Sequence, residues 1–244
     1  MKPPSFFDDI YRRYPEGWGC SERKSQLFRY RIYLNMISRI GPLPETALDL
    51  GCGEGYLASL LVHLGIRNVI GVDVSKIAVE RARRKYPDIE FYEGSITDIP
   101  WGILGLKGAP RLVVAGEVLY YLTEEEQRAA VASIHGAIEA GAYVLVSVNL
   151  GPKPYFTADS LHELFRAFDC VETRGIYLKT FHRFVESPLW YLRSRLRRVP
   201  VIEPLCRWLL QRAPVEAISR LSRRLSAAEE TIRIAMFRKP ARLA

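Results

Sequence analysis

Cysteine is scarce in this chain, and its few copies are scattered. None of the four lies in a CxxC or another metal-ligand spacing; they are Cys20, Cys52, Cys170 and Cys206. This distribution argues against a disulfide framework and against a zinc site. Histidine is equally sparse, and three of its four copies fall in helical patterns without spaced partners: His63, His135 and His162. We therefore expect reduced thiols and no metal site.

Long apolar runs are absent as well. No uninterrupted apolar stretch reaches the roughly 18 residues that are needed to cross a bilayer, although apolar residues make up 48% of the chain. The first residues, MKPPSFFDDIYRRY, carry acids and arginines where a signal peptide has an apolar segment. These absences favour a cytoplasmic protein with a sizeable core, either free or held peripherally at the inner face of the membrane.

Acidic residues are few toward the C-terminus. Residues 179–244 contain 15 Lys and Arg against 5 Asp and Glu, whereas residues 1–178 contain 20 against 22. The C-terminal part therefore carries +10 and the rest −2, which together give the formal charge of +8. This asymmetry indicates an anionic partner, namely a membrane surface, a nucleic acid or a negatively charged substrate. The alternative is that the arginine-rich helices are simply well solvated.

Strand patterns alternate with helical patterns through the first two thirds of the chain. Short β-rich apolar runs lie at 46–50, 68–73, 89–94, 111–116 and 142–148, and helical patterns lie between them at 55–64, 75–86 and 123–139. Ser75 predicts a helix start, and Thr123 with Glu126 forms a capping-box pattern. A further helix over 21–40 precedes the first strand. Repeated strand–helix alternation predicts a parallel sheet that helices cover on both faces.

Two more strands are expected after a helix over 157–168, for which Ser160 and Glu163 form a capping-box pattern. The first strand covers 170–180, and the second covers 230–240, with Ile232, Ile234 and Met236 on one face. Residues 181–228 separate them and predict two or three arginine-rich amphipathic helices, broken near Pro200, Pro204 and Pro214. We expect one domain over 1–244, in which a helical cap (1–42) and the basic insertion (181–228) join a core made of 43–180 and 229–240.

A glycine-rich turn follows the first strand. Gly51, Gly53 and Gly55 stand where the strand ends and a helix begins, so the backbone can turn sharply and approach a ligand closely. Asp73 ends the second strand, close to the spacing at which an acid reaches ribose hydroxyls. The dinucleotide fingerprint GxGxxG fits less well, because Tyr56 occupies the place of its third glycine. The pattern predicts a nucleoside site, with a tight turn that binds nothing as the alternative.

Four ordered motifs resemble those of class I S-adenosylmethionine-dependent methyltransferases: LDLGCGEG (48–55), GVDVS (71–75), EGSITDIP (93–100) and VVAGEVLYYL (113–122). The resemblance implies an α/β, Rossmann-like, seven-stranded sheet that is mostly parallel with an antiparallel last strand, here with a helical insertion. It implies S-adenosylmethionine as cofactor, with Asp73 at the ribose and Ser95 and Ile96 at the adenine. The cofactor residues that it implies are Asp49, Gly51, Cys52, Gly53, Gly55, Tyr56, Asp73, Val74, Ser95, Ile96, Gly116 and Glu117.

A narrower resemblance is to the nodulation-type N-methyltransferases, which act on chitin-derived oligosaccharides. It rests on GEVLYYL (116–122) and GWGCSERK (17–24), and it departs from that group in the glycine before Glu117 and in the basic insertion. We also expect an acceptor pocket that contains Trp18, Glu22 and Tyr121. The substrate of that group is not carried over.

Methyl transfer from a sulfonium requires an in-line nucleophile, which a base assists when the acceptor is a hydroxyl or an ammonium. The candidate catalytic residues are Glu117, Tyr120, Tyr121 and His182. We expect an O or N nucleophile on a small-molecule, glycan or lipid-linked acceptor. An RNA-modifying enzyme and a non-catalytic cofactor-binding regulator are the alternatives. The chain has no Asn/Asp-Pro-Pro-Tyr segment after the fourth strand, which argues against base-amino methylation of nucleic acid.

The basic insertion alternates bulky apolar residues with arginines over residues 187–226. Trp190, Tyr191, Leu192, Trp208, Leu209 and Leu210 are interspersed with Arg193, Arg195, Arg197, Arg198, Arg207 and Arg212. This composition is typical of helices that lie in the headgroup layer of an anionic membrane. RNA phosphates and a homodimer interface are the other partners that the pattern allows.

Overall fold

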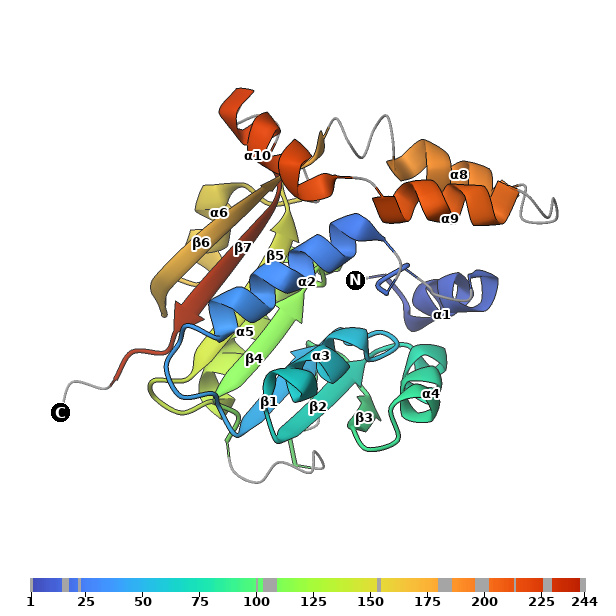
Figure 1. Ribbon diagram of the computed structural model, residues 1–244. Coiled ribbons are helices and arrows are strands. Elements are labelled where there is room, and N and C mark those ends of the chain that lie inside the picture. The colour runs from blue at the N-terminus through green and yellow to red at the C-terminus, as the bar shows by residue number, and fades with distance from the viewer. Residues whose placement is uncertain are drawn as a thin grey trace.

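A seven-stranded sheet runs through the computed structural model, which describes residues 2–14, 18–21, 23–99, 101–102, 109–152, 155–179, 186–195, 202–212, 214–225 and 230–241. The strand order is β3-β2-β1-β4-β5-β7-β6 (Figure 1). The strands are β1 Thr46–Leu50, β2 Asn68–Asp73, β3 Glu90–Glu93, β4 Leu112–Gly116, β5 Tyr143–Asn149, β6 Asp169–Tyr177 and β7 Glu230–Arg238. Only β7 pairs antiparallel with its neighbours, β5 and β6. The predicted fold class, including the antiparallel last strand, is confirmed.

Helices cover both faces of the sheet, as the strand–helix alternation predicts. On one face lie α2 (Lys24–Ile37), α3 (Tyr56–Leu64) and α4 (Lys76–Lys85), with buried side chains such as Tyr33 and Leu61 in the core beneath them. On the other face lie α5 (Glu124–Ala137) and α6 (Ala158–Leu164), which bury Ile134, Leu161 and their neighbours. The short α1 (Pro4–Arg13) packs against α4.

The expected helix starts are confirmed for two of the three helices. The Ser75 hydroxyl accepts the Ala78 N–H at 3.2 Å, and Thr123 and Glu126 form a complete capping box. The third prediction is wrong, because α6 begins after Thr157 and not at Ser160. Thr157 Oγ1 accepts the Ser160 N–H at 3.1 Å, and Ser160 Oγ accepts the Thr157 N–H at 2.9 Å. A serine thus fills the place in the box that Glu or Gln usually takes.

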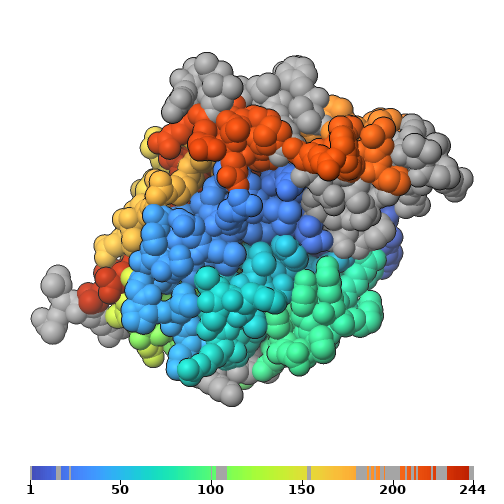
Figure 2. Space-filling model, in the orientation of Figure 1, coloured from blue at the N-terminus to red at the C-terminus, as the bar shows by residue number. Residues whose placement is uncertain are grey.

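Three helices lie in the chain between β6 and β7: α8 (Ser187–Arg195), α9 (Ile202–Arg212) and α10 (Val215–Leu225). The last of them packs on the sheet, where Ser219 Oγ accepts the Tyr177 N–H at 3.2 Å and Glu216 pairs with Arg31 of α2. The other two lie side by side beyond α1 and α2, at one edge of the molecule (Figures 1 and 2). The sheet therefore anchors both ends of this segment, while α8 and α9 extend away from it.

The strand order also fixes where a ligand can bind. The chain leaves β1 toward β2 and β3 on one side, and later fills β4 and β5 on the other side. The carboxyl ends of β1 and β4 therefore border the point where the direction of strand order reverses. In open α/β sheets a crevice forms at that point, because the loops that follow the two strands diverge.

Candidate functional site

A cavity of about 370 Å³ opens at the carboxyl ends of β1, β2 and β4, with α1 and α2 along its side. Ten of the twelve predicted cofactor residues line it: Asp49, Gly51, Cys52, Gly53, Asp73, Val74, Ser95, Ile96, Gly116 and Glu117. The structure thus brings together residues from four separate motifs. The predicted acceptor residues Trp18 and Tyr121 line the same cavity.

The loop after β1 needs glycine at the positions that face the cavity. Gly51 and Gly53 have φ of 73° and 54°, a region that other residues rarely adopt. The Tyr11 side chain extends from α1 to the loop, and a Cβ on Gly53 would lie 2.7 Å from its hydroxyl. The loop is therefore both tightly turned and closely covered, which leaves its backbone as the surface that a ligand meets.

Gly55 and Tyr56 are not among the residues that line the cavity, and the structure places both of them behind the loop. Gly55 has φ of 80° and is the N-cap of α3, and a Cβ there would lie 2.5 Å from the Phe91 ring. Tyr56 turns toward α2, with its ring centroid 5.7 Å from that of Tyr30. Both residues fix the loop from behind, by packing.

Asp73 holds the loop in place and keeps acceptor capacity for a ligand. Its carboxylate accepts the Gly53 N–H at 2.8 Å and the Ser75 N–H at 2.9 Å. A carboxylate has about four acceptor positions, so two backbone bonds leave others for hydroxyl donors in the cavity. Asp8 of α1 adds to this region, because it accepts the Ser75 hydroxyl at 2.5 Å. The first helix is thus fastened beside the acid that the sequence assigns to the ribose.

Asp49 carries a buried carboxylate that lacks a full set of partners. The residue is 2% exposed, and its Oδ2 has no hydrogen-bond partner among the described residues. Burial, followed by the neighbouring charge of Asp73, raises the pKa of Asp49 to about 7. Buried polar atoms without partners are rare in folded proteins. Since Asp49 lines the cavity, a cationic or hydrogen-bond-donating group of a ligand would satisfy this oxygen.

The raised pKa of Asp49 gives a first testable prediction for the ligand-free protein. Its folded-state pKa of about 7 lies above the ordinary value of 3.8, so the folded protein binds more protons than the unfolded chain between these pH values. The free energy of unfolding should therefore fall as pH rises from about 4 to 7. In urea titrations across this range, Asp49→Asn should flatten the slope, and the exposed Asp88→Asn should not. An unchanged slope in the Asp49 variant would contradict the prediction.

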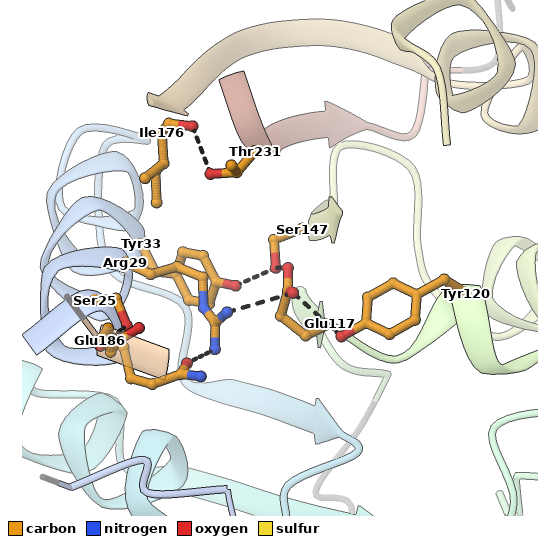
Figure 3. A network of polar contacts seen from close by, with 10 residues as sticks. Ser25, Arg29, Tyr33, Glu117, Tyr120, Ser147, Ile176, Glu186 and Thr231 are labelled. Atoms are coloured by element: carbon orange, nitrogen blue, oxygen red, sulfur yellow. Dashed lines mark hydrogen bonds and ion pairs between the residues drawn. The ribbon is translucent and has the colours of Figure 1, made fainter. Parts of the chain in front are cut away.

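Glu117 stands at the end of β4 in a strained conformation. Its φ is 61°, and among the described residues no other non-glycine residue has a positive φ. Its Oε1 accepts the Ser147 hydroxyl at 2.8 Å, its Oε2 accepts the Tyr120 hydroxyl at 3.2 Å, and Arg29 Nη1 lies 3.4 Å from Oε2 (Figure 3). The Tyr33 hydroxyl in turn pairs with Ser147. Strain that surrounding contacts maintain in this way is typical of functional positions.

Arg29 is a cavity residue that the sequence analysis did not name. It comes from α2, its side chain is 7% exposed, and its Nε has no hydrogen-bond partner among the described residues. Its guanidinium donates a hydrogen bond to the Gln26 side chain and forms an ion pair with Glu117. Figure 3 shows the pair with Glu117. A signal was present, because Arg29 lies four residues before Tyr33 and seven before Met36, on the buried face of the helix. A charge on that face has to meet either a counterion or a ligand.

Aromatic rings from four segments form the other side of the cavity. The Tyr121 ring centroid lies 5.1 Å from that of Phe7, 6.2 Å from Trp18 and 4.7 Å from Tyr120, which lies 5.6 Å from Tyr155. Burial raises the pKa of Tyr120 and brings that of Tyr121 to about 12. In the ligand-free structure both phenols therefore keep their protons at neutral pH, and each can donate a hydrogen bond.

Glu186 brings the segment before α8 into the cavity wall. It is 2% exposed, and its carboxylate accepts the Ser25 hydroxyl at 2.6 Å (Figure 3). The sequence analysis did not single it out, because 161 positions separate the two partners. Two predicted site residues, Glu22 and His182, lie outside the described residues.

Residues 47–141 match a protein family described as a methyltransferase domain. Curated relatives also match part of the chain. A ribosomal protein L11 methyltransferase of Clostridium botulinum is 33% identical over 93 residues, which is 35% of this chain and 28% of that protein. A probable S-adenosylmethionine-dependent methyltransferase of Mycobacterium tuberculosis is 40% identical over 73 residues, 29% of this chain and 26% of that protein. The matched stretches thus cover less than a third of these relatives.

Solved structures match over most of the chain. The N-methyltransferase NodS of Bradyrhizobium japonicum, in complex with S-adenosyl-L-homocysteine, has a TM-score of 0.64 at 15% identity and covers 96% of this chain and 98% of its own. The [4+2]-cyclase SpnF has a TM-score of 0.60 at 18% identity, with 88% of this chain and 82% of its own covered. At these identities the likeness establishes the fold alone, and the same fold also occurs in a protein described as a cyclase.

Proposed function

We propose that this chain is a class I S-adenosylmethionine-dependent methyltransferase that transfers the methyl group of that cofactor to an O or N nucleophile of a small-molecule acceptor, and the match of residues 47–141 to a methyltransferase domain supports this. One observation carries the proposal. The cavity that contains the glycine loop and Asp73 also contains Glu117 and the aromatic side chains around Tyr121. Donor and acceptor groups would therefore meet at the end of β4.

The residues present suit the cofactor at three points. The turn at Gly51 and Gly53 offers bare backbone, the spare acceptor positions of Asp73 suit ribose hydroxyls, and the unpartnered Oδ2 of Asp49 suits an ammonium group. Ser95 and Ile96, to which the resemblance assigns the adenine, line the same cavity. Arg29, which is buried and cationic, suits a carboxylate group. Together these groups match the charges of an amino acid joined to a nucleoside.

When bound, the cofactor supplies a methyl group on a sulfonium that is already electrophilic, so orientation of the nucleophile contributes much of the rate. Positioning is worth up to roughly 7–11 kcal/mol in well-oriented systems. In this chain Glu117 is held on three sides, by Ser147, Tyr120 and Arg29. Its carboxylate would accept a hydrogen bond from an acceptor hydroxyl, or would take the proton of an acceptor ammonium and so free its lone pair, and it would hold that lone pair toward the methyl group. The surrounding aromatic rings would exclude water and favour a cationic acceptor.

The proposal is tested by following label from S-[methyl-³H]-adenosylmethionine into fractions of a cell extract. The intact protein should bind S-adenosylhomocysteine in calorimetry and should label compounds in the small-molecule or lipid fraction. Label that enters only RNA would contradict the proposal and favour the RNA-modifying alternative. Cofactor binding without labelled product in any fraction would favour the non-catalytic regulator. Absence of cofactor binding by the folded protein would contradict both readings.

A further inference from the structure

Large apolar side chains are exposed on α8 and α9 to an unusual degree. Ten large apolar residues are exposed in the described part of the chain, and five of them belong to these two helices, which together contain 20 residues. They are Tyr191 (60% exposed), Leu205 (51%), Trp208 (49%), Leu192 (41%) and Leu209 (39%). An exposed group of this kind marks an interaction site more often than an isolated apolar residue does.

Arginines accompany the two aromatic rings of this group. The Arg195 guanidinium lies 5.5 Å from the centroid of the Tyr191 ring, and its Nε donates to the tyrosine hydroxyl at 2.9 Å. The Arg212 guanidinium lies 4.3 Å from the centroid of the Trp208 ring. We call the five apolar residues with these two arginines the α8–α9 surface. Each ring thus presents an apolar body together with a cation, which suits the boundary between hydrocarbon and headgroups.

The charge of the segment is strongly one-sided. Residues 186–225 contain nine arginines, no lysine and three glutamates. Two of the three acids have local partners, because Glu186 accepts from Ser25 and Glu216 pairs with Arg31. The surplus of positive charge is therefore available to an anionic partner. Among the described helices, none combines the length and the apolar character of a membrane-spanning segment.

We propose that the α8–α9 surface docks on an anionic lipid membrane. Phosphate contacts alone would need cations without exposed leucines, and a dimer seam would leave the arginines without an anionic counterpart. A lipid surface accounts for both features, since leucine and the aromatic rings enter the headgroup boundary while arginines meet anionic headgroups. Figures 1 and 2 show α8 and α9 at an outer edge of the molecule, away from the sheet.

This docking would also orient the cavity. Glu186 directly precedes α8, lines the cavity and is tied to α2 through Ser25. The helix that meets the membrane is therefore continuous with a wall of the acceptor site. This step rests on the proposed function, and it favours an amphiphilic acceptor whose apolar part stays in the membrane while its nucleophile enters the cavity. The docking itself does not depend on catalysis.

The test is flotation of the full-length protein with two kinds of vesicle, pure phosphatidylcholine and phosphatidylcholine mixed with phosphatidylglycerol. We expect binding to the mixed vesicles that weakens with salt. Replacing both arginines (Arg195→Gln with Arg212→Gln) should weaken it about 25-fold, at roughly fivefold for each cation. Leu205→Ala with Trp208→Ala should weaken it about tenfold through lost apolar burial.

Matched controls replace exposed residues of the same kinds elsewhere. Arg67→Gln with Arg166→Gln removes two arginines that are 83% and 79% exposed, and Val62→Ala with Val171→Ala trims two exposed apolar side chains. Neither control should change vesicle binding by more than about twofold. All variants should keep their melting temperature and their affinity for S-adenosylhomocysteine, so a loss of docking is separable from a loss of fold or of cofactor binding.

Three results would overturn the docking proposal. One is the absence of flotation with anionic vesicles, and another is equal loss of binding in the control and test variants. The third is that the α8–α9 surface serves another partner and the protein does not bind vesicles. That partner would be a single-stranded RNA oligonucleotide that binds this surface, or a second copy in an obligate dimer that sedimentation detects. If flotation behaves as expected but cofactor binding fails, the proposed function is wrong and the docking stands.

Discussion

Asp73→Ala should lower the affinity for S-adenosylhomocysteine by about 100-fold in calorimetry. Hydrogen bonds to a charged group contribute about 1.5–3 kcal/mol each, and this carboxylate would lose its bonds to the ribose. It would also lose its bonds to Gly53 and Ser75, which fix the glycine loop and the start of α4. The two effects act in the same direction, because a loosened loop presents a less ordered backbone to the ligand.

Two further variants separate these effects. Asp73→Asn keeps the size of the side chain and one acceptor oxygen, and it removes the charge of a carboxyl whose pKa burial raises, so the loop should be disturbed less than in Asp73→Ala while affinity still falls by about tenfold or more. Glu93→Ala removes an exposed acid opposite Asp73 in the β2–β3 register and should leave affinity unchanged. Equal affinities in the Glu93 and Asp73 variants would refute the assignment of Asp73 to the ribose.

Glu117→Gln is expected to slow methyl transfer by about 100- to 1,000-fold, with little change in cofactor affinity. A positioned acid–base group contributes about this much, and the amide that replaces the carboxylate cannot hold a proton or balance the charge of Arg29. The readout is the initial rate of label transfer to the acceptor fraction, compared with calorimetric affinity for S-adenosylhomocysteine. Glu163→Gln, which alters an exposed glutamate of α6, serves as the matched control.

Ser147→Ala tests whether the network around Glu117 positions its carboxylate. Ser147 is fully buried, donates to Glu117 and also pairs with Tyr33. Its loss should give an intermediate effect on the rate, because one of three supports is removed while the carboxylate remains. If Glu117→Gln weakens cofactor binding as much as it slows turnover, then Glu117 belongs to the cofactor site and its assignment to the acceptor fails.

The sequence predicts the sheet well, and it also predicts most residues that line the cavity at the ends of β1, β2 and β4, because both depend on local patterns. Apolar runs bounded by helical periodicity give β1, β2 and β4, and the glycines mark the place where the chain leaves β1. The misplaced start of α6 has a local cause too, since Thr157 and Ser160 satisfy each other's backbone N–H groups with hydroxyls alone. Spacing rules that look for a glutamate or glutamine miss such a box.

The part of the cavity around Glu117 and Glu186 depends on contacts between segments that lie far apart in the sequence. Ser147 meets Tyr33 across 114 positions and Glu117 across 30, and Ser25 meets Glu186 across 161. No periodicity within a single element encodes these pairs. The positive φ of Glu117 also escapes sequence reasoning, because a glutamate gives no sign of a backbone conformation that tertiary contacts impose.

Because β6 pairs with β7, the segment between these two strands can change in length without disturbing the sheet. Tyr177 and Glu230 are partners in that ladder. The segment between them therefore begins and ends at neighbouring positions on the sheet. Doubling the length of such an excursion costs only about 0.6 kcal/mol of closure entropy. The chain can therefore replace α8, α9 and α10 while β1, β2 and the glycine loop stay unchanged.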